Sequence, residues 1–346
     1  MKKLLIPLFS LAVMTSCGTT NISDGTTSNP VSTNHDKAFT NAYKEIKAED
    51  LKKNLYVIAA DDMEGRDTGS KGQKKAGEYI TNYYKSLGIS YPKTLGSYYQ
   101  KVPSEFMKKR GGGSLPDSEN ILAFIEGSEK PEEIVVVSAH YDHVGIKNGV
   151  VYNGADDDGS GTVAVMEIAK AFQQAKNAGK GPKRSVLFLH VTGEEHGLFG
   201  SEYYSENPVF PLANTVVDLN IDMIGRDDPG NRGKQYVYVI GSDMLSSQLK
   251  VINEAANKRT NNLELNYKYD DLNDPEQLYY RSDHYNFAKH NIPVAFFFDG
   301  IHEDYHKPTD DPEKIDYPLL QKRAQLIFTT AWDIANREER IVVDRK

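Results

Sequence analysis

Three consecutive acidic residues, Asp156, Asp157 and Asp158, lie in a glycine-flanked turn before a segment with the apolar spacing of a helix. Carboxylates this close together repel one another, so water or a cation must compensate them. From Asp156 to Glu167 the sequence also fits a calcium loop of the EF-hand type. Such a loop needs a helix on both sides, whereas the residues before this one are strand-like and its second half already has helical spacing. The pattern therefore favours a catalytic metal over calcium.

Histidines and acids also follow the apolar segments that are typical of buried strands. They are His140, Asp142 and His143 after one segment, Glu194 and Glu195 after the next, Asp222 near the end of a third, and His302, Asp304 and His306 after a fourth. In a parallel α/β sheet, ligands bind beyond the carboxyl ends of the strands. We therefore expect these side chains to converge on one site.

Imidazole and carboxylate groups together suit borderline divalent metals such as zinc. Two histidines with three or four carboxylates exceed the needs of one tetrahedral zinc, and they suit two metals that share a carboxylate. The adjacent residues Glu194 and Glu195 then fit a division of labour, in which one binds metal and the other transfers a proton from the activated water.

The elements that must position these residues alternate along the chain. The expected strands are residues 120–126, 133–140, 185–193, 216–225, 235–241 and 292–300, and the expected helices are 48–65, 72–88, 161–175 and 243–257. Nearly continuous apolar strands between helices indicate a largely parallel sheet that is covered on both faces. The predicted fold is a single α/β domain over residues 37–346.

The first residues have the pattern of an export signal. Lys2 and Lys3 precede an apolar run, and Cys17, the only cysteine in the chain, follows it. We expect residues 1–17 to be a lipoprotein signal peptide with Cys17 as the lipidation site, and residues 18–36, rich in Ser, Thr, Asn and Gly, to be a flexible tether. The expected location is the cell envelope, by a lipid anchor, or outside the cell. A net charge of -8 argues against a nucleic-acid partner.

Several motifs resemble the metal-dependent aminopeptidases of the M28 type. They are HYDHVG, NGADDDGSG, TGEEHGLFGS, NIDMIGR and YHKPTDD, together with MEGRDTGSKG and RSDHYNFAKHNIP, and they cover nearly all of residues 50–330 in the family's order. The resemblance implies a mixed, largely parallel sheet sandwiched between helices, a pair of zinc ions and peptide substrates. It suggests a secreted lipoprotein member of the family, which we expect to be a monomer.

The resemblance also implies a role for each matched residue. His140 and Asp222 would bind one zinc, Glu195 and His306 the other, Asp157 would bridge the two, Glu194 would be the general base, Asp142 would orient His140, and Tyr305 would stabilise the developing oxyanion. Relatives often have a cis peptide bond at the position of Asp158. Asp156 is the least constrained of the three acids, and we expect it to be solvated or to cap the following helix.

Some assignments stay open on the sequence alone. His143 fits a pocket residue or an ordinary loop histidine equally well, and His302 competes with His306 because both lie in one loop. We expect His190 to be a satisfied core residue and Arg66 to hold its own loop. The same fold also serves glutaminyl cyclases, which use one zinc and an internal amine as nucleophile. A non-enzymatic binding module would have lost a ligand or the base, but every matched position is present.

Overall fold

The computed structural model describes residues 33–345. The expected signal peptide, Cys17 and most of the expected tether lie outside these residues. The first helix begins at Thr33, so the domain boundary that we expected at residue 37 falls inside a helix. Within the described part of the chain, no helix is both long and apolar enough to span a membrane.

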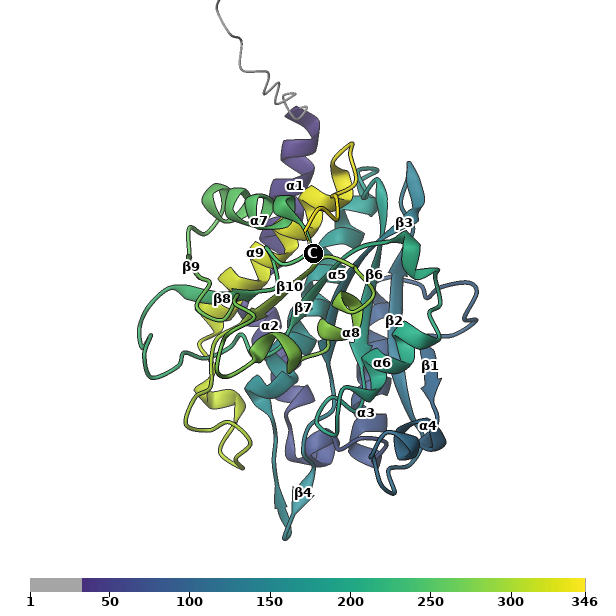
Figure 1. Cartoon of the computed structure of the whole chain (residues 1–346), viewed down its shortest axis with the longest axis vertical. Helices are drawn as coiled ribbons and strands as arrows, with labels where there is room; N and C mark the ends of the chain where they lie inside the picture. Colours follow the sequence, from purple (N-terminus) through teal and green to yellow (C-terminus); the bar gives the residue numbers. More distant parts are fainter. Residues whose placement is uncertain (1–32, 346) are drawn as a thin grey trace, which may run out of the picture.

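Helices and strands alternate through most of the chain (Figure 1). The helices are α1 (Thr33–Glu45), α2 (Ala48–Ile58), α3 (Lys71–Ser86), α4 (Ser104–Lys109), α5 (Gly161–Asn177), α6 (Phe199–Glu206), α7 (Ser247–Arg259), α8 (Tyr285–Ala288) and α9 (Tyr317–Asn336). The strands are β1 (Tyr99–Val102), β2 (Ser118–Ile125), β3 (Lys130–His140), β4 (Ile146–Lys147), β5 (Val150–Val151), β6 (Arg184–Val191), β7 (Thr215–Ile221), β8 (Tyr236–Ile240), β9 (Glu264–Asn266) and β10 (Val294–Phe298). Each of the six strands expected from the sequence is a strand of the structure.

The main sheet has the strand order β1-β2-β6-β3-β7-β10-β8-β9. Its centre is parallel, because β3 pairs in parallel with β6 and β7, and β7 pairs in parallel with β10. β2 and β8 run antiparallel to this centre and flank it. The mixed, largely parallel α/β sheet that we expected is therefore present, and the carboxyl ends of four central strands meet at one edge.

Alternate residues of each central strand belong to different hydrophobic cores, as the period of two in a strand requires. In β3, Val135 and Val137 pack in the larger core with residues of α2, α5 and α9, whereas Ile134 and Val136 pack in the other core with residues of α6 and α8. Helices therefore cover both faces of the sheet, as the apolar strand segments predicted.

A buried arginine ties the start of the domain to the loops at the strand ends. Arg66 follows α2 in the short helical turn η1 (Asp61–Arg66), and its side chain is fully buried. Its guanidinium donates hydrogen bonds to the carbonyl groups of Ile58, Tyr141, Asn153 and Gly154. Arg66 therefore joins loops beyond its own, namely those after β3 and before the three aspartates.

The position of η1 depends on a close approach to α3. A Cβ atom at Gly72 would lie 1.8 Å from the carbonyl oxygen of Met63, whereas one at Gly77, in the same helix, would lie 3.4 Å from Ile121 Cδ1. The first distance is a clash with backbone and the second is close packing against a flexible side chain. Only Gly72 is therefore required for the contact between η1 and α3.

We predict opposite effects for alanine at these two glycines. Gly72→Ala forces η1 away from α3 and should lower the free energy of unfolding by about 1–3 kcal/mol. Gly77→Ala removes an unfavourable helix residue and should change stability by at most about 1 kcal/mol, toward higher stability. Urea unfolding of both variants beside the parent protein measures the difference. Equal midpoints for the two variants would contradict the packing described here.

Candidate metal centre

The four parallel strands deliver the expected side chains to one edge of the sheet. His140 is the last residue of β3, Glu194 and Glu195 follow β6, Asp222 follows β7, and His306 lies in the loop after β10. Asp157 reaches the same place from the turn η2 (Ala155–Ser160), which precedes α5. The structure therefore brings together all five residues that we expected to bind metal.

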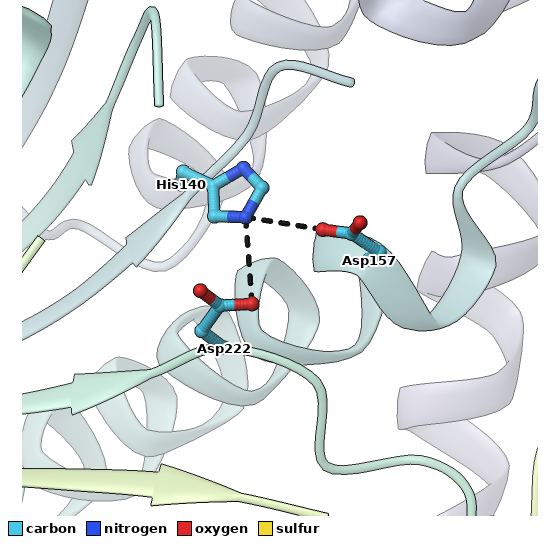
Figure 2. Close-up of side chains that lie close together, drawn as sticks. All are labelled: His140, Asp157 and Asp222. Carbon is cyan, nitrogen blue, oxygen red and sulfur yellow. Dashed lines mark ion pairs between the residues drawn. The ribbon is translucent and has the colours of Figure 1, made fainter. Parts of the chain in front are cut away.

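Asp157 stands between two groups of ligand atoms. Its Oδ1 lies 3.3 Å from His140 Nε2, which is also 3.5 Å from Asp222 Oδ1 (Figure 2). Its Oδ2 lies 3.1 Å from His306 Nε2, which is 3.0 Å from Glu195 Oε2. One carboxylate thus offers one oxygen to each group, as a bridging ligand must.

The candidate ligand atoms of the site are close together, but several of them have no hydrogen-bond partner in the described part of the chain, as is expected of atoms that bind a metal ion. His140 Nε2, Asp157 Oδ2 and Glu195 Oε1 are buried and have no hydrogen-bond partner among the described residues. Burial acts to raise the pKa of Asp157, but the imidazoles of His140 and His306 beside it hold that pKa well below its usual value. Imidazole and carboxylate donors at this spacing are a suitable set for zinc.

The three aspartates have three separate roles. Asp156 is fully buried; its Oδ1 accepts a hydrogen bond of 2.7 Å from the Gly225 amide, and its Oδ2 lies 3.1 Å from His302 Nε2. The expectation that Asp156 is solvated or caps α5 was therefore wrong. Asp158 makes the cap instead, because its Oδ1 accepts from the Gly161 amide, and the peptide bond between Asp157 and Asp158 is cis.

Neighbouring groups fix the direction of the ligands. The amides of Asp156 and Asp157 both donate to the carboxylate of Asp310, in the sequence motif that also contains His306. Asp222 Oδ2 accepts a hydrogen bond of 2.7 Å from the Ser282 hydroxyl, so that Oδ1 is left for His140 and a metal. We did not single out Asp310 or Ser282 from the sequence, although both lie in quoted motifs.

Asp142 lies beside His140 as expected, but its backbone makes the closer contact. His140 Nδ1 is 3.1 Å from the carbonyl oxygen of Asp142 and 3.7 Å from its carboxylate. The carboxylate accepts hydrogen bonds from the Thr68 hydroxyl and, at 3.3 Å, from the Glu194 amide. A proton on Nδ1 that faces this carbonyl leaves Nε2 free as a ligand, and Asp142 also positions the backbone of Glu194.

Glu194 and Tyr305 line a cleft together with two of the expected ligands, Asp157 and Asp222. Glu194 Oε2 is 3.9 Å from His140 Nε2. Burial raises the pKa of Glu194 well above its usual value, the charges of Asp222 and Glu195 strengthen the effect, and His140 opposes it. A carboxylate of raised pKa next to a metal centre is suited to proton transfer.

His143 belongs to the site, which settles the choice that the sequence left open. The residue is fully buried, and its Nδ1 lies 2.7 Å from Glu195 Oε1, the oxygen that faces away from His306. Its ring occupies the space beside Gly154, where a Cβ atom would lie 2.4 Å from the imidazole. Two histidines therefore flank Glu195, His143 at Oε1 and His306 at Oε2.

The remaining candidates lie outside the two groups. His302 contacts Asp156 and not Glu195, and His190 is a buried core residue whose Nε2 lies 2.6 Å from the Tyr84 hydroxyl. Glu167, the last position of the calcium-loop pattern, accepts hydrogen bonds from Asn54 and Lys170 within the helical layer. The calcium-loop pattern therefore does not correspond to a site.

Comparison with known proteins identifies the family of the chain. Residues 120–331 match the model of the family described as "Peptidase family M28". A probable leucine aminopeptidase of Trichophyton verrucosum is 30% identical over 223 residues, which are 62% of this chain and 57% of that protein. A probable zinc metalloprotease of Pyricularia oryzae is 31% identical over 163 residues, which are 46% of this chain and 30% of that protein. The chain thus spans less than two thirds of the length of these relatives.

Solved structures share the fold. The chain is similar to a zinc aminopeptidase from Bacillus subtilis, with a TM-score of 0.64, 16% identity, and coverage of 87% of this chain and 99% of that one. It is also similar to the LapA aminopeptidase of Legionella pneumophila, with a TM-score of 0.68, 17% identity, and coverage of 95% and 81%. Because the family model matches more than half of the sequence, this chain belongs to peptidase family M28.

Proposed function

We propose that the protein is a metallo-aminopeptidase that hydrolyses N-terminal residues from peptides with two zinc ions. The observation that carries the proposal is the Asp157 carboxylate, whose two oxygens face two separate histidine and carboxylate pairs. His140 and Asp222 would hold one zinc, Glu195 and His306 the other, and Asp157 both. Zinc bound there supplies Lewis-acid polarisation of the scissile carbonyl and lowers the pKa of the attacking water.

The other side chains of the cleft perform the proton transfer and the positioning. Glu194 takes a proton from the attacking water and delivers it to the leaving amine, for which its position beside His140 and its raised pKa are suited. The Tyr305 hydroxyl donates to the carbonyl oxygen as negative charge develops on it. No observation favours the glutaminyl cyclase alternative.

Replacement of the proposed base tests this mechanism. Glu194→Gln keeps the shape of the side chain but cannot accept a proton, so we expect kcat for an aminoacyl reporter to fall by about 10²–10⁴-fold with unchanged zinc content. Glu206→Gln, at an exposed position that pairs with Arg110, is the matched control and should keep the parent rate. Full activity of Glu194→Gln with normal zinc content would exclude Glu194 as the base.

His143 supports the second zinc through Glu195. His143 Nδ1 lies 2.7 Å from Glu195 Oε1. Because an ionised Glu195 can only accept a hydrogen bond, the proposed role requires the His143 proton to turn toward Oε1, which leaves Oε2 for the metal. Loss of this contact frees the carboxylate to rotate. The proposed role is that of a positioning residue, although the atoms of His143, Asp157 and Glu195 also lie close enough together to hold a metal ion.

Two substitutions at this position separate packing from hydrogen bonding. His143→Phe fills the space without a donor and should weaken the binding of the more loosely held zinc by about 10–100-fold. His143→Asn places an amide donor near the position of Nδ1 and should restore most of the affinity. Zinc per chain after dialysis against a graded series of chelator concentrations gives the measurement. Equal zinc retention by the parent, Phe and Asn proteins would contradict the role.

We also propose that the protein is a monomer held in the cell envelope by lipid on Cys17. Support for the anchor comes from the sequence alone: Lys2 and Lys3, an apolar run and then the only cysteine of the chain. The Ser-, Thr-, Asn- and Gly-rich residues that follow would serve as a tether between the membrane and the catalytic domain.

Replacement of Cys17 tests the anchor. Acyl chains bind to membranes by burying their CH₂ groups, at about 0.8 kcal/mol each, so Cys17→Ser should move the protein from the membrane fraction to the soluble fraction. Ser16→Ala, next to it, should leave the protein in the membrane fraction. Immunoblots of the two fractions measure the distribution. Membrane association that survives in Cys17→Ser would rule out this anchor.

A further inference from the structure

One basic side chain reaches the cleft beside the metal centre. Polar and apolar side chains line the cleft in about equal measure, three of them carboxylates, and its volume is about 390 Å³ including space open to solvent. The lining residues are Asp157, Glu194, Asp222, Met223, Leu278, Arg281, Phe296, Phe298, Ile301 and Tyr305. Arg281 is the only cationic group among them.

The backbone holds Arg281 in place through its neighbours. Its amide donates to the carbonyl of Leu278, another lining residue, and the next residue is Ser282. The Ser282 hydroxyl binds Asp222, and it accepts a hydrogen bond of 2.9 Å from the Asn220 side chain. Arg281 therefore directly precedes Ser282, whose hydroxyl is hydrogen-bonded to the proposed zinc ligand Asp222. This contact fixes the position of the Arg281 backbone beside the cleft.

The guanidinium of Arg281 has no strong partner. Glu276 lies at the limit of contact, with 4.0 Å to its carboxylate and 3.5 Å to its carbonyl oxygen, and the Arg281 side chain is 44% exposed. A surface pair of this kind contributes about 0–1 kcal/mol, so a ligand can displace it. In contrast, the buried Arg66 and Arg323 donate to backbone carbonyls on several sides.

The charge of Arg281 acts mainly on the substrate. The four carboxylates of Asp157, Glu194, Glu195 and Asp222 would be about balanced by two zinc ions. The guanidinium is then the one cationic group among the lining residues that a substrate meets. Guanidinium groups bind carboxylates with paired, charge-assisted hydrogen bonds.

We propose that Arg281 binds a carboxylate of the substrate and makes the enzyme prefer peptides with a carboxylate close to the scissile bond. Two sources have this chemistry: the side chain of an N-terminal Glu or Asp, and the free C-terminus of a dipeptide. The inference rests on the proposed aminopeptidase activity, and it assigns a specificity role to Arg281 without a part in the chemical step.

Matched substrates separate the two sources. Glu and Gln reporters differ only in the charge of the N-terminal side chain, and Leu-Gly and Leu-Gly-amide differ only at the C-terminus. We expect kcat/KM of the zinc-loaded parent protein to be about 10–100-fold higher for the charged member of one pair, in keeping with a hydrogen bond to a charged group. The pair that shows the preference identifies the source of the carboxylate.

Substitutions then test the residue itself. Arg281→Met keeps an apolar stem that can cover the wall of the cleft but has no charge, so it should abolish the preference while the rates for Gln and Leu-Gly-amide stay within about threefold of the parent. Arg281→Lys should keep part of the preference. Arg259→Met is the control for the loss of an exposed arginine, since the Arg259 side chain is 46% exposed and lies on α7. Thermal melts establish that each variant is folded.

The possible failures are distinguishable. A parent protein with bound zinc that releases no N-terminal residue from any of these substrates, or from a Leu reporter, would overturn the proposed function. A parent protein that hydrolyses them without preferring either carboxylate would overturn only the role of Arg281. The same holds for a preference that persists unchanged in Arg281→Met.

Discussion

The burial of many carboxylates at one edge of the sheet is the constraint on which the rest of this structure depends. Asp142, Asp156, Asp157, Asp158 and Asp222 are all buried there. An ionised carboxylate loses several kcal/mol of hydration when it is buried, and neighbours of the same charge add to this cost. A fold with this arrangement must supply donors and cations at the same edge, or the acids would be protonated.

These carboxylates have two kinds of partner. Some accept hydrogen bonds from backbone amides and hold the turn in place, whereas others face histidines and are the proposed metal ligands. Asp156 and Asp158 each accept a backbone hydrogen bond, from Gly225 and Gly161 respectively, and Asp310 accepts from two amides of the η2 turn. These acids hold the turn in place. Each of Asp156, Asp157, Asp158 and Glu195 has one buried oxygen without a hydrogen-bond partner among the described residues. Asp157 and Glu195 differ in that no backbone amide of those residues donates to either carboxylate, and both face histidines instead.

The sequence predicted which side chains meet at this edge of the sheet, because each one lies within a few residues of a strand end or in a motif of fixed spacing. His140, Glu195 and Asp222 follow this rule, since parallel strands end at one edge and the short distance along the chain leaves little freedom. It did not predict α9, because nearly all of that helix is buried and an apolar stripe is therefore missing. The burial of Asp156 and the contact between His143 and Glu195 depend on how loops that are distant in the sequence pack together. Arg66 helps to hold these loops by donating hydrogen bonds to the backbone carbonyls of Asn153 and Gly154. Any residue can supply a backbone carbonyl, so these contacts cannot be recognised in the sequence.

The proposed metal centre and the proposed substrate cleft share one backbone segment. The segment around residues 278–282 contributes Leu278 and Arg281 to the cleft and, one residue later, the hydroxyl that orients Asp222. A change that displaces this backbone would alter the cleft and also turn a metal ligand. Replacement of the side chain at position 281, which lines the cleft, avoids this conflict, because the neighbouring Ser282 keeps its hydrogen bond to Asp222. Substrate preference can therefore vary there at little cost to the metal centre, whereas insertions in the same segment would affect both.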